Sequence, residues 1–145
     1  MRATDIFSLE RHDGEYENWP LQTRLLINGL PSSCYLPGYR LLHQFQTPAN
    51  EYLLISDCDC PFEEATEVIL LDSQCKVLAL RSFRVPYGAF CLDEAQVLDP
   101  ANLKLSFFRD DHWQLTITPK NQFCLHFSSR TGLPAFRTRL QLKPL

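Results

Sequence analysis

The stretch Val68-Ile69-Leu70-Leu71-Asp72-Ser73-Gln74-Cys75-Lys76-Val77-Leu78-Ala79-Leu80 sets the fold class, because two aliphatic runs flank a short polar break. Apolar runs of about four to eight residues, bounded by turn-forming residues, are typical of β-strands. The stretch therefore predicts a β-hairpin that turns at Asp72-Ser73-Gln74. The same pattern recurs about forty residues later, where residues 103–107 and 115–117 flank a polar turn at Arg109-Asp110-Asp111.

From residue 39 onward the chain keeps a period of two, with a proline, glycine or aspartate break every eight to twelve residues or so. The predicted strands are 39–46, 51–57, 66–71, 75–84, 89–98, 103–109, 112–118, 122–127 and 135–142. This rhythm predicts an antiparallel meander of eight or nine strands that forms a β-sandwich or a half-open barrel. A propeller is excluded, because blades of about 40 to 45 residues cannot close a ring within 145 residues.

One helix is predicted near the N-terminus, over residues 18–31. Asn18 is a favourable N-cap, Pro20 suits the first turn, Gly29 suits a C-terminal cap and Pro31 follows it. With this helix the fold class is mainly β, of the α+β type. No linker or low-complexity stretch interrupts the chain, so residues 1–145 are expected to form a single domain.

Composition limits the classes of partner. The chain has 145 residues, 45% hydrophobic and 21% charged, with a net charge of −3, so no overall basic field attracts nucleic acid. The first thirty residues lack the apolar run of a signal peptide, and no run approaches the length of a membrane span. We therefore expect a cytoplasmic protein without a membrane partner, whose six cysteines are reduced.

Charge is segregated along the chain. Residues 41–75 carry seven acidic and no basic side chains, whereas residues 112–145 carry five basic and no acidic ones. The acidic block consists of Glu51, Asp57, Asp59, Glu63, Glu64, Glu67 and Asp72, and the basic block of Lys120, Arg130, Arg137, Arg139 and Lys143. Two interpretations remain open: the blocks pair with each other inside the fold, or the acidic block faces an external cationic surface.

No pattern of catalytic or cofactor-binding residues is found. Cys58 and Cys60 could offer two thiolates to zinc, but a structural zinc site needs four ligands, and no second pair has a matching spacing. The five glycines are isolated, so the chain has no phosphate-binding loop. We expect no metal, no cofactor and no enzymatic activity.

The last predicted strand, 135–142, and the residue that follows it offer an alternative site. Strict alternation places Arg137, Arg139 and Lys143 on one face and apolar residues on the other. Such a basic strand either protects a sheet edge from aggregation or contacts nucleic acid or a small ligand.

Small, acidic, β-rich chains of this kind resemble the immunity proteins of bacterial toxin–immunity pairs, including those of contact-dependent growth inhibition. The resemblance covers the general character of the chain and the cluster from Asp57 to Glu67. It implies an inhibitor whose acidic surface neutralises the basic cleft of a cognate toxin, such as a nuclease, or another basic protein. The residues expected to bind the partner are Asp57, Asp59, Glu63, Glu64 and Glu67, with Tyr52 and Phe62 beside them.

Overall fold

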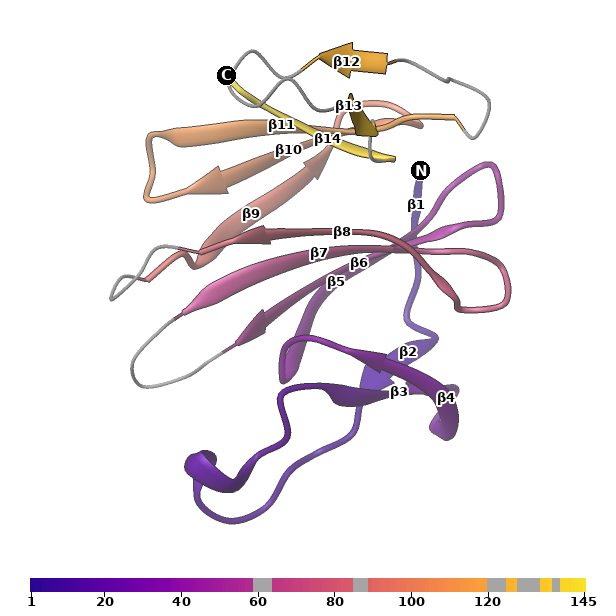
Figure 1. Ribbon diagram of the computed structural model, residues 1–145, viewed down its shortest axis with the longest axis vertical. Helices are drawn as coiled ribbons and strands as arrows, with labels where there is room; N and C mark the ends of the chain where they lie inside the picture. Colours follow the sequence, from indigo (N-terminus) through magenta and orange to yellow (C-terminus); the bar gives the residue numbers. More distant parts are fainter. Residues whose placement is uncertain (59–63, 85–88, 120–124, 128–133, 137–138) are drawn as a thin grey trace.

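A five-stranded antiparallel sheet forms the middle layer of the molecule (Figure 1). The computed structural model describes residues 1–58, 64–84, 89–119, 125–127, 134–136 and 139–145. The central sheet has the order β1-β5-β6-β7-β8. Its strands are β1 (Arg2–Ala3), β5 (Arg40–Gln46), β6 (Tyr52–Cys58), β7 (Ala65–Leu71) and β8 (Val77–Phe83). The hairpin predicted around Asp72 is confirmed by β7 and β8, which pair antiparallel.

Two smaller antiparallel sheets lie on either side of the central sheet (Figure 1). The three-stranded sheet has the order β2-β3-β4, and the four-stranded sheet has the order β14-β11-β10-β9. The strands of the first are β2 (Phe7–Leu9), β3 (Thr23–Ile27) and β4 (Leu30–Leu36). Those of the second are β9 (Leu92–Val97), β10 (Asn102–Phe107), β11 (Asp111–Ile117) and β14 (Leu140–Pro144). β12 (Leu125–Phe127) and β13 (Pro134–Phe136) pair with each other.

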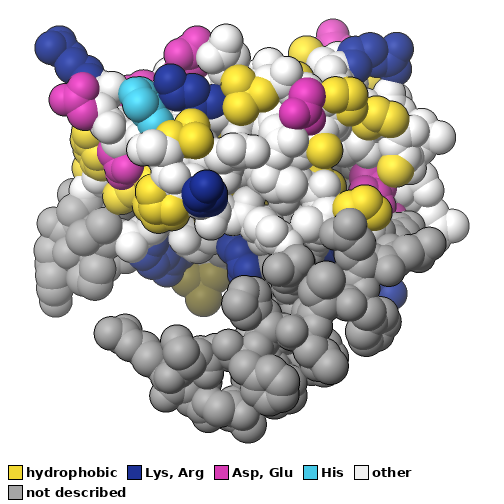
Figure 2. Space-filling model, turned by 90° about the horizontal axis from the view of Figure 1, so that it is seen from above, with side chains coloured by type: hydrophobic (Ala, Val, Ile, Leu, Met, Phe, Trp, Pro, Cys, Tyr) yellow, Lys and Arg dark blue, Asp and Glu magenta, His cyan; other side chains and the backbone are white. Residues whose placement is uncertain are grey.

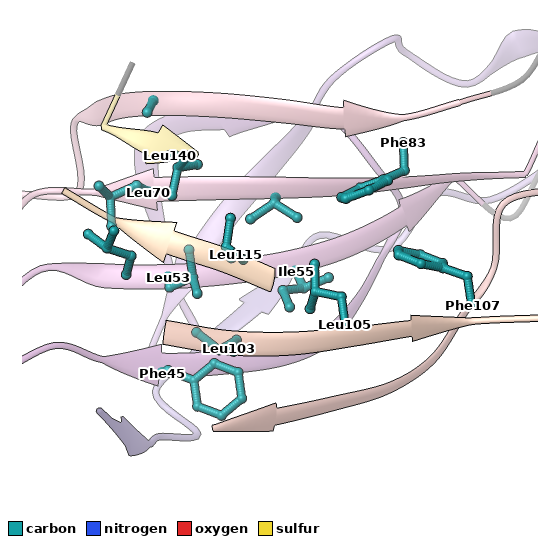
Figure 3. Close-up of a cluster of buried hydrophobic side chains, with 13 residues drawn as sticks. Phe45, Leu53, Ile55, Leu70, Phe83, Leu103, Leu105, Phe107, Leu115 and Leu140 are labelled. Carbon is teal, nitrogen blue, oxygen red and sulfur yellow. The ribbon is translucent and has the colours of Figure 1, made fainter. Parts of the chain in front are cut away.

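The central sheet buries both of its faces, and this produces two hydrophobic cores. Residues 53, 55, 68 and 70 face the four-stranded sheet, where Leu103, Leu105 and Leu115 meet them in the first core (Figure 3). The second core lies against the three-stranded sheet and consists of Phe7, Leu25, Leu36, Leu54, Ile69 and Leu71. Every residue of β7 is consequently buried, which explains why its sequence is an almost continuous apolar run.

The predicted helix over residues 18–31 is wrong, because most of this segment forms the β3–β4 hairpin. Asn28 and Gly29 both have positive φ, at 49° and 78°, as the two central residues of a type I′ turn require. Ile27 and Leu30 pair across this turn. The Asn-Gly dipeptide is thus a hairpin turn rather than a helix cap, and the only helical element in the described residues is one short 3₁₀ turn, η1 (Tyr16–Asn18).

The antiparallel β architecture predicted from residue 39 onward is confirmed, and the strands β5 to β11 overlap the predicted ones. In the described residues the five-, four- and three-stranded sheets are stacked, and none of the sheets closes into a barrel. The single last strand predicted over 135–142 is wrong: β13 ends at Phe136 and β14 begins at Leu140, in a different sheet. Arg139 precedes β14, and its side chain turns to a buried carboxylate described below.

Candidate protein-binding surface

Glu51 of the acidic block forms a buried ion pair with Arg139 of the basic block. Arg139 Nη1 donates to Glu51 Oε1 at 2.9 Å, and Nη2 donates to Oε2 at 2.7 Å. The Glu51 side chain is 3% exposed and that of Arg139 is 18% exposed. Arg139 Nε also donates to the backbone carbonyl of Thr118 at 2.6 Å. The interpretation that the two blocks pair internally is therefore confirmed for these two residues, which tie the central sheet to the four-stranded sheet.

Asp57 and Glu67 are also buried, and each pairs with an arginine whose own side chain is more than half exposed. Arg40 Nε donates to Asp57 Oδ2 at 3.1 Å, and Arg84 Nη2 donates to Glu67 Oε1 at 3.0 Å. In the register of the sheet Glu67 lies opposite Ser56, the residue before Asp57. Since neighbouring residues of a strand point to opposite faces, Asp57 and Glu67 lie on opposite faces of the central sheet. They do not form one acidic surface.

Of the other residues that the sequence assigned to partner binding, the structure describes Glu64 and Tyr52, which lie at opposite ends of the β6–β7 pair. The Glu64 Oε2 carboxylate oxygen accepts a bond from the Cys91 thiol at 2.7 Å. The half-buried Tyr52 ring packs edge-on against Phe7, with the ring centroids 4.9 Å apart. Asp59, Phe62 and Glu63 lie outside the described residues.

Of the alternative basic site, the structure describes Arg139 and Lys143. Arg137 lies outside the described residues, and the guanidinium of Arg139 is held by Glu51. Lys143 lies on β14, where it is exposed and pairs in register with Gln114. Among the residues that the structure describes, no group of three or more His, Cys, Asp or Glu side chains could hold a metal ion.

An acidic surface that the sequence interpretation missed lies in the loop between β2 and β3. This loop, residues 10–22, is hereafter the acidic loop. Its carboxylates are Glu10, Asp13, Glu15 and Glu17. With Arg11 as its one basic residue the loop has a net charge of −3, equal to that of the whole chain, because the other 13 acidic and 13 basic residues cancel. The loop forms the end of the molecule farthest from the four-stranded sheet (Figure 1).

Three aromatic rings of the acidic loop pack around a fourth ring from outside it. They are His12, Tyr16, Trp19 and, from the start of the central sheet, Tyr39. The centroid of the Tyr39 ring lies 5.1 Å from that of Trp19, 5.7 Å from that of His12 and 5.8 Å from that of Tyr16. These are edge-to-face arrangements, the geometry that aromatic pairs prefer. The ring cluster therefore braces the loop with half-buried side chains.

Hydrogen bonds hold the same rings to the loop backbone. Trp19 Nε1 donates to the carbonyl of Gly14 at 3.2 Å, and the Tyr39 hydroxyl donates to the carbonyl of Pro20 at 3.0 Å. His12 Nε2 lies 3.0 Å from the hydroxyl of the buried Thr23. A loop fixed by ring packing and by these bonds loses less conformational entropy when a partner binds.

The outer side of the acidic loop is charged and includes an apolar side chain. Asp13, Glu15 and Glu17 are exposed and form no ion pair with any residue of the described chain. Leu21 is 91% exposed, the highest value among the large hydrophobic residues described. Carboxylates steer a basic partner toward the surface, and an apolar side chain beside them can fill a pocket of that partner.

The opposite end of the molecule has a different surface. Figure 2 looks onto the end above the four-stranded sheet, where Lys and Arg, Asp and Glu, and hydrophobic side chains lie interspersed over the coloured atoms. No single sign of charge dominates that part of the face. The acidic loop is therefore distinguished from it by charge as well as by position.

Comparison with known proteins identifies no relative: no protein-family model, no curated protein and no solved structure matches the chain. Within the described residues, no helix has the length and apolar character that crossing a membrane demands.

Proposed function

We propose that the protein is a protein-binding inhibitor of the immunity type, which neutralises a basic cognate toxin in the cytoplasm through the acidic loop. The observation that carries the proposal is a fixed loop with the net charge of the whole chain, −3. Long-range attraction speeds the encounter with a basic surface, and a preorganised loop lowers the entropic cost of binding. The proposal requires no catalytic step and no cofactor.

The buried carboxylates of the acidic block fit the proposal only as structural groups. Asp57 and Glu67 already have cationic partners, so a basic toxin would have to displace Arg40 and Arg84 before meeting them. The alternative function, binding of nucleic acid or a small ligand by the C-terminal basic residues, has less support, because Glu51 neutralises Arg139. The exposed and unpaired carboxylates of the acidic loop make it a better candidate binding surface than the acidic block or the C-terminal basic residues.

A matched pair of charge variants tests the proposal. The loop variant carries Asp13→Asn, Glu15→Gln and Glu17→Gln, and the control carries Asp5→Asn, Glu94→Gln and Asp110→Asn, three exposed acids outside the loop. Both variants change the net charge equally. We expect affinity for a basic protein partner, captured from lysate and then purified, to fall about 100-fold in the loop variant and less than about threefold in the control.

The measurement is titration calorimetry at low and at moderate salt, together with rescue of cells that express the captured partner. Equal affinity of the two variants would remove the acidic loop from the binding surface. Co-purification of nucleic acid in place of a basic protein would instead favour the C-terminal basic residues. Loss of rescue in the loop variant alone is the result that the inhibitor proposal requires.

A further inference from the structure

A cavity lies where the central sheet meets the four-stranded sheet. It has a volume of about 210 Å³ and is bounded by the β5–β6 turn, the β9–β10 turn and the end of β11. Its lining includes three buried residues and three exposed prolines. The buried residues are Thr47, Glu51 and Ile117, and the prolines are Pro48, Pro100 and Pro119.

The charges in this cavity are already paired. Of the described residues that line it, only Glu51 and Arg139 carry a charge, and these two form the bidentate ion pair between the sheets. A carboxylate ligand would meet the buried carboxylate of Glu51, and an ammonium ligand would meet the guanidinium of Arg139. Charge complementarity therefore favours a neutral ligand.

The guanidinium of Arg139 still has hydrogen-bond donors to offer. A guanidinium carries five N–H groups. Three of them donate to Glu51 and to the carbonyl of Thr118, so two have no acceptor among the described residues. The prolines contribute ring carbons and no N–H group to the walls. A ligand that matches this lining has an apolar body and a hydrogen-bond acceptor.

We propose that this cavity binds a small neutral molecule that combines an apolar ring with one oxygen acceptor. An apolar cavity of about 150 Å³ holds benzene. The volume of about 210 Å³ found here accommodates roughly two further non-hydrogen atoms. The ring packs against the prolines and Ile117, and the oxygen accepts a bond from Arg139. The ion pair with Glu51 stays intact, so this site differs from the capture of an anion by the C-terminal basic residues.

The test titrates the isotopically labelled full chain with four probes of similar size at neutral pH and follows the amide chemical shifts. Benzyl alcohol has a ring and an oxygen, toluene lacks the oxygen, benzylamine is a cation and benzoate is an anion. We expect benzyl alcohol to bind with a dissociation constant of about 1 mM and to shift the amides of Ala101, Thr118 and Arg139. Toluene should bind at least about threefold more weakly, and the two charged probes at least about tenfold more weakly.

A pair of alanine variants locates the bound probe. Ala101 lines the cavity, so the larger side chain of Ala101→Leu takes up ligand volume. Its affinity for benzyl alcohol should fall at least about tenfold. The control is Ala3→Leu, which enlarges an exposed alanine of β1 outside the cavity and should change the affinity less than about twofold.

Three results would overturn the binding site. The first is the lack of saturable shifts at the amides of Ala101, Thr118 and Arg139, including shifts that spread over the first core instead. The second is benzoate or benzylamine binding as tightly as benzyl alcohol, and the third is an unchanged affinity in folded Ala101→Leu. Because the four probes are compared on the unmodified chain, the answer does not depend on whether that variant folds. The cavity lies outside the acidic loop, so its failure leaves the proposed function unaffected.

Discussion

Replacing Arg139 by methionine is expected to lower the free energy of unfolding by about 3–5 kcal/mol, the usual cost of removing one partner of a buried ion pair. The Glu51 side chain is 3% exposed, so water cannot replace the two hydrogen bonds that the guanidinium donates. The backbone carbonyl of Thr118 loses its bond from Arg139 Nε as well. Arg139→Met thus leaves the Glu51 carboxylate and the Thr118 carbonyl without these hydrogen bonds, where the central sheet meets the four-stranded sheet.

Urea denaturation measures this loss of stability. Two further variants show whether the loss comes from the ion pair itself. Lys143→Met removes an exposed basic residue from the same terminal segment and should cost less than about 0.5 kcal/mol. Glu51→Leu combined with Arg139→Met removes both charges and should recover most of the lost stability, because apolar pairs often replace buried ion pairs without net cost. If Arg139→Met were as mild as Lys143→Met, the ion pair would not join the sheets.

Strands β5 to β8 of the central sheet could be predicted because apolar runs and turn residues are local signals, whereas the two-residue strand β1 could not. The helix prediction failed because Gly29 suits both a helix end and a hairpin, and only the preceding Asn28 favours the hairpin. The outward position expected for Glu67 failed for a different reason. Alternation assigns Glu67 to one face of the central sheet, but the sequence does not reveal that the three-stranded sheet packs against that face.

The acidic loop was only half predictable. Its charge excess can be counted in the sequence, yet the acidic block around Asp57 has a higher density of carboxylates and drew the prediction there. What distinguishes the loop is the ring cluster, in which Tyr39 joins Trp19 from a position 20 residues later in the chain. The contact between these distant residues arises where the chain crosses from β4 of the three-stranded sheet to β5 of the central sheet. Local sequence patterns do not encode that crossing.

That crossing depends on Gly38, and Gly38→Ala is the second change for which we expect a large effect. Gly38 is buried between β4 and β5 with a φ of 97°. A Cβ atom there would lie 2.6 Å from Ser56 Oγ, 2.8 Å from Ser56 Cβ and 2.9 Å from the carbonyl oxygen of Asp57. The backbone cannot retreat freely, because the amide of Tyr39 donates to that same Asp57 carbonyl at 2.8 Å.

We expect Gly38→Ala to lower the free energy of unfolding by about 3 kcal/mol or more, from backbone strain and overpacking together. Gly29→Ala is the matched control: its φ is 78°, but no atom lies within 4 Å of the added Cβ, so only the strain of about 1–2 kcal/mol remains. Thermal and urea denaturation of both variants separate the two contributions. Equal losses would mean that the close approach to Ser56 relaxes without cost.

Because Tyr39 follows Gly38 directly, Gly38→Ala should also displace the ring cluster, and near-ultraviolet circular dichroism detects that displacement. The variant should then weaken partner binding without removing any charge from the acidic loop.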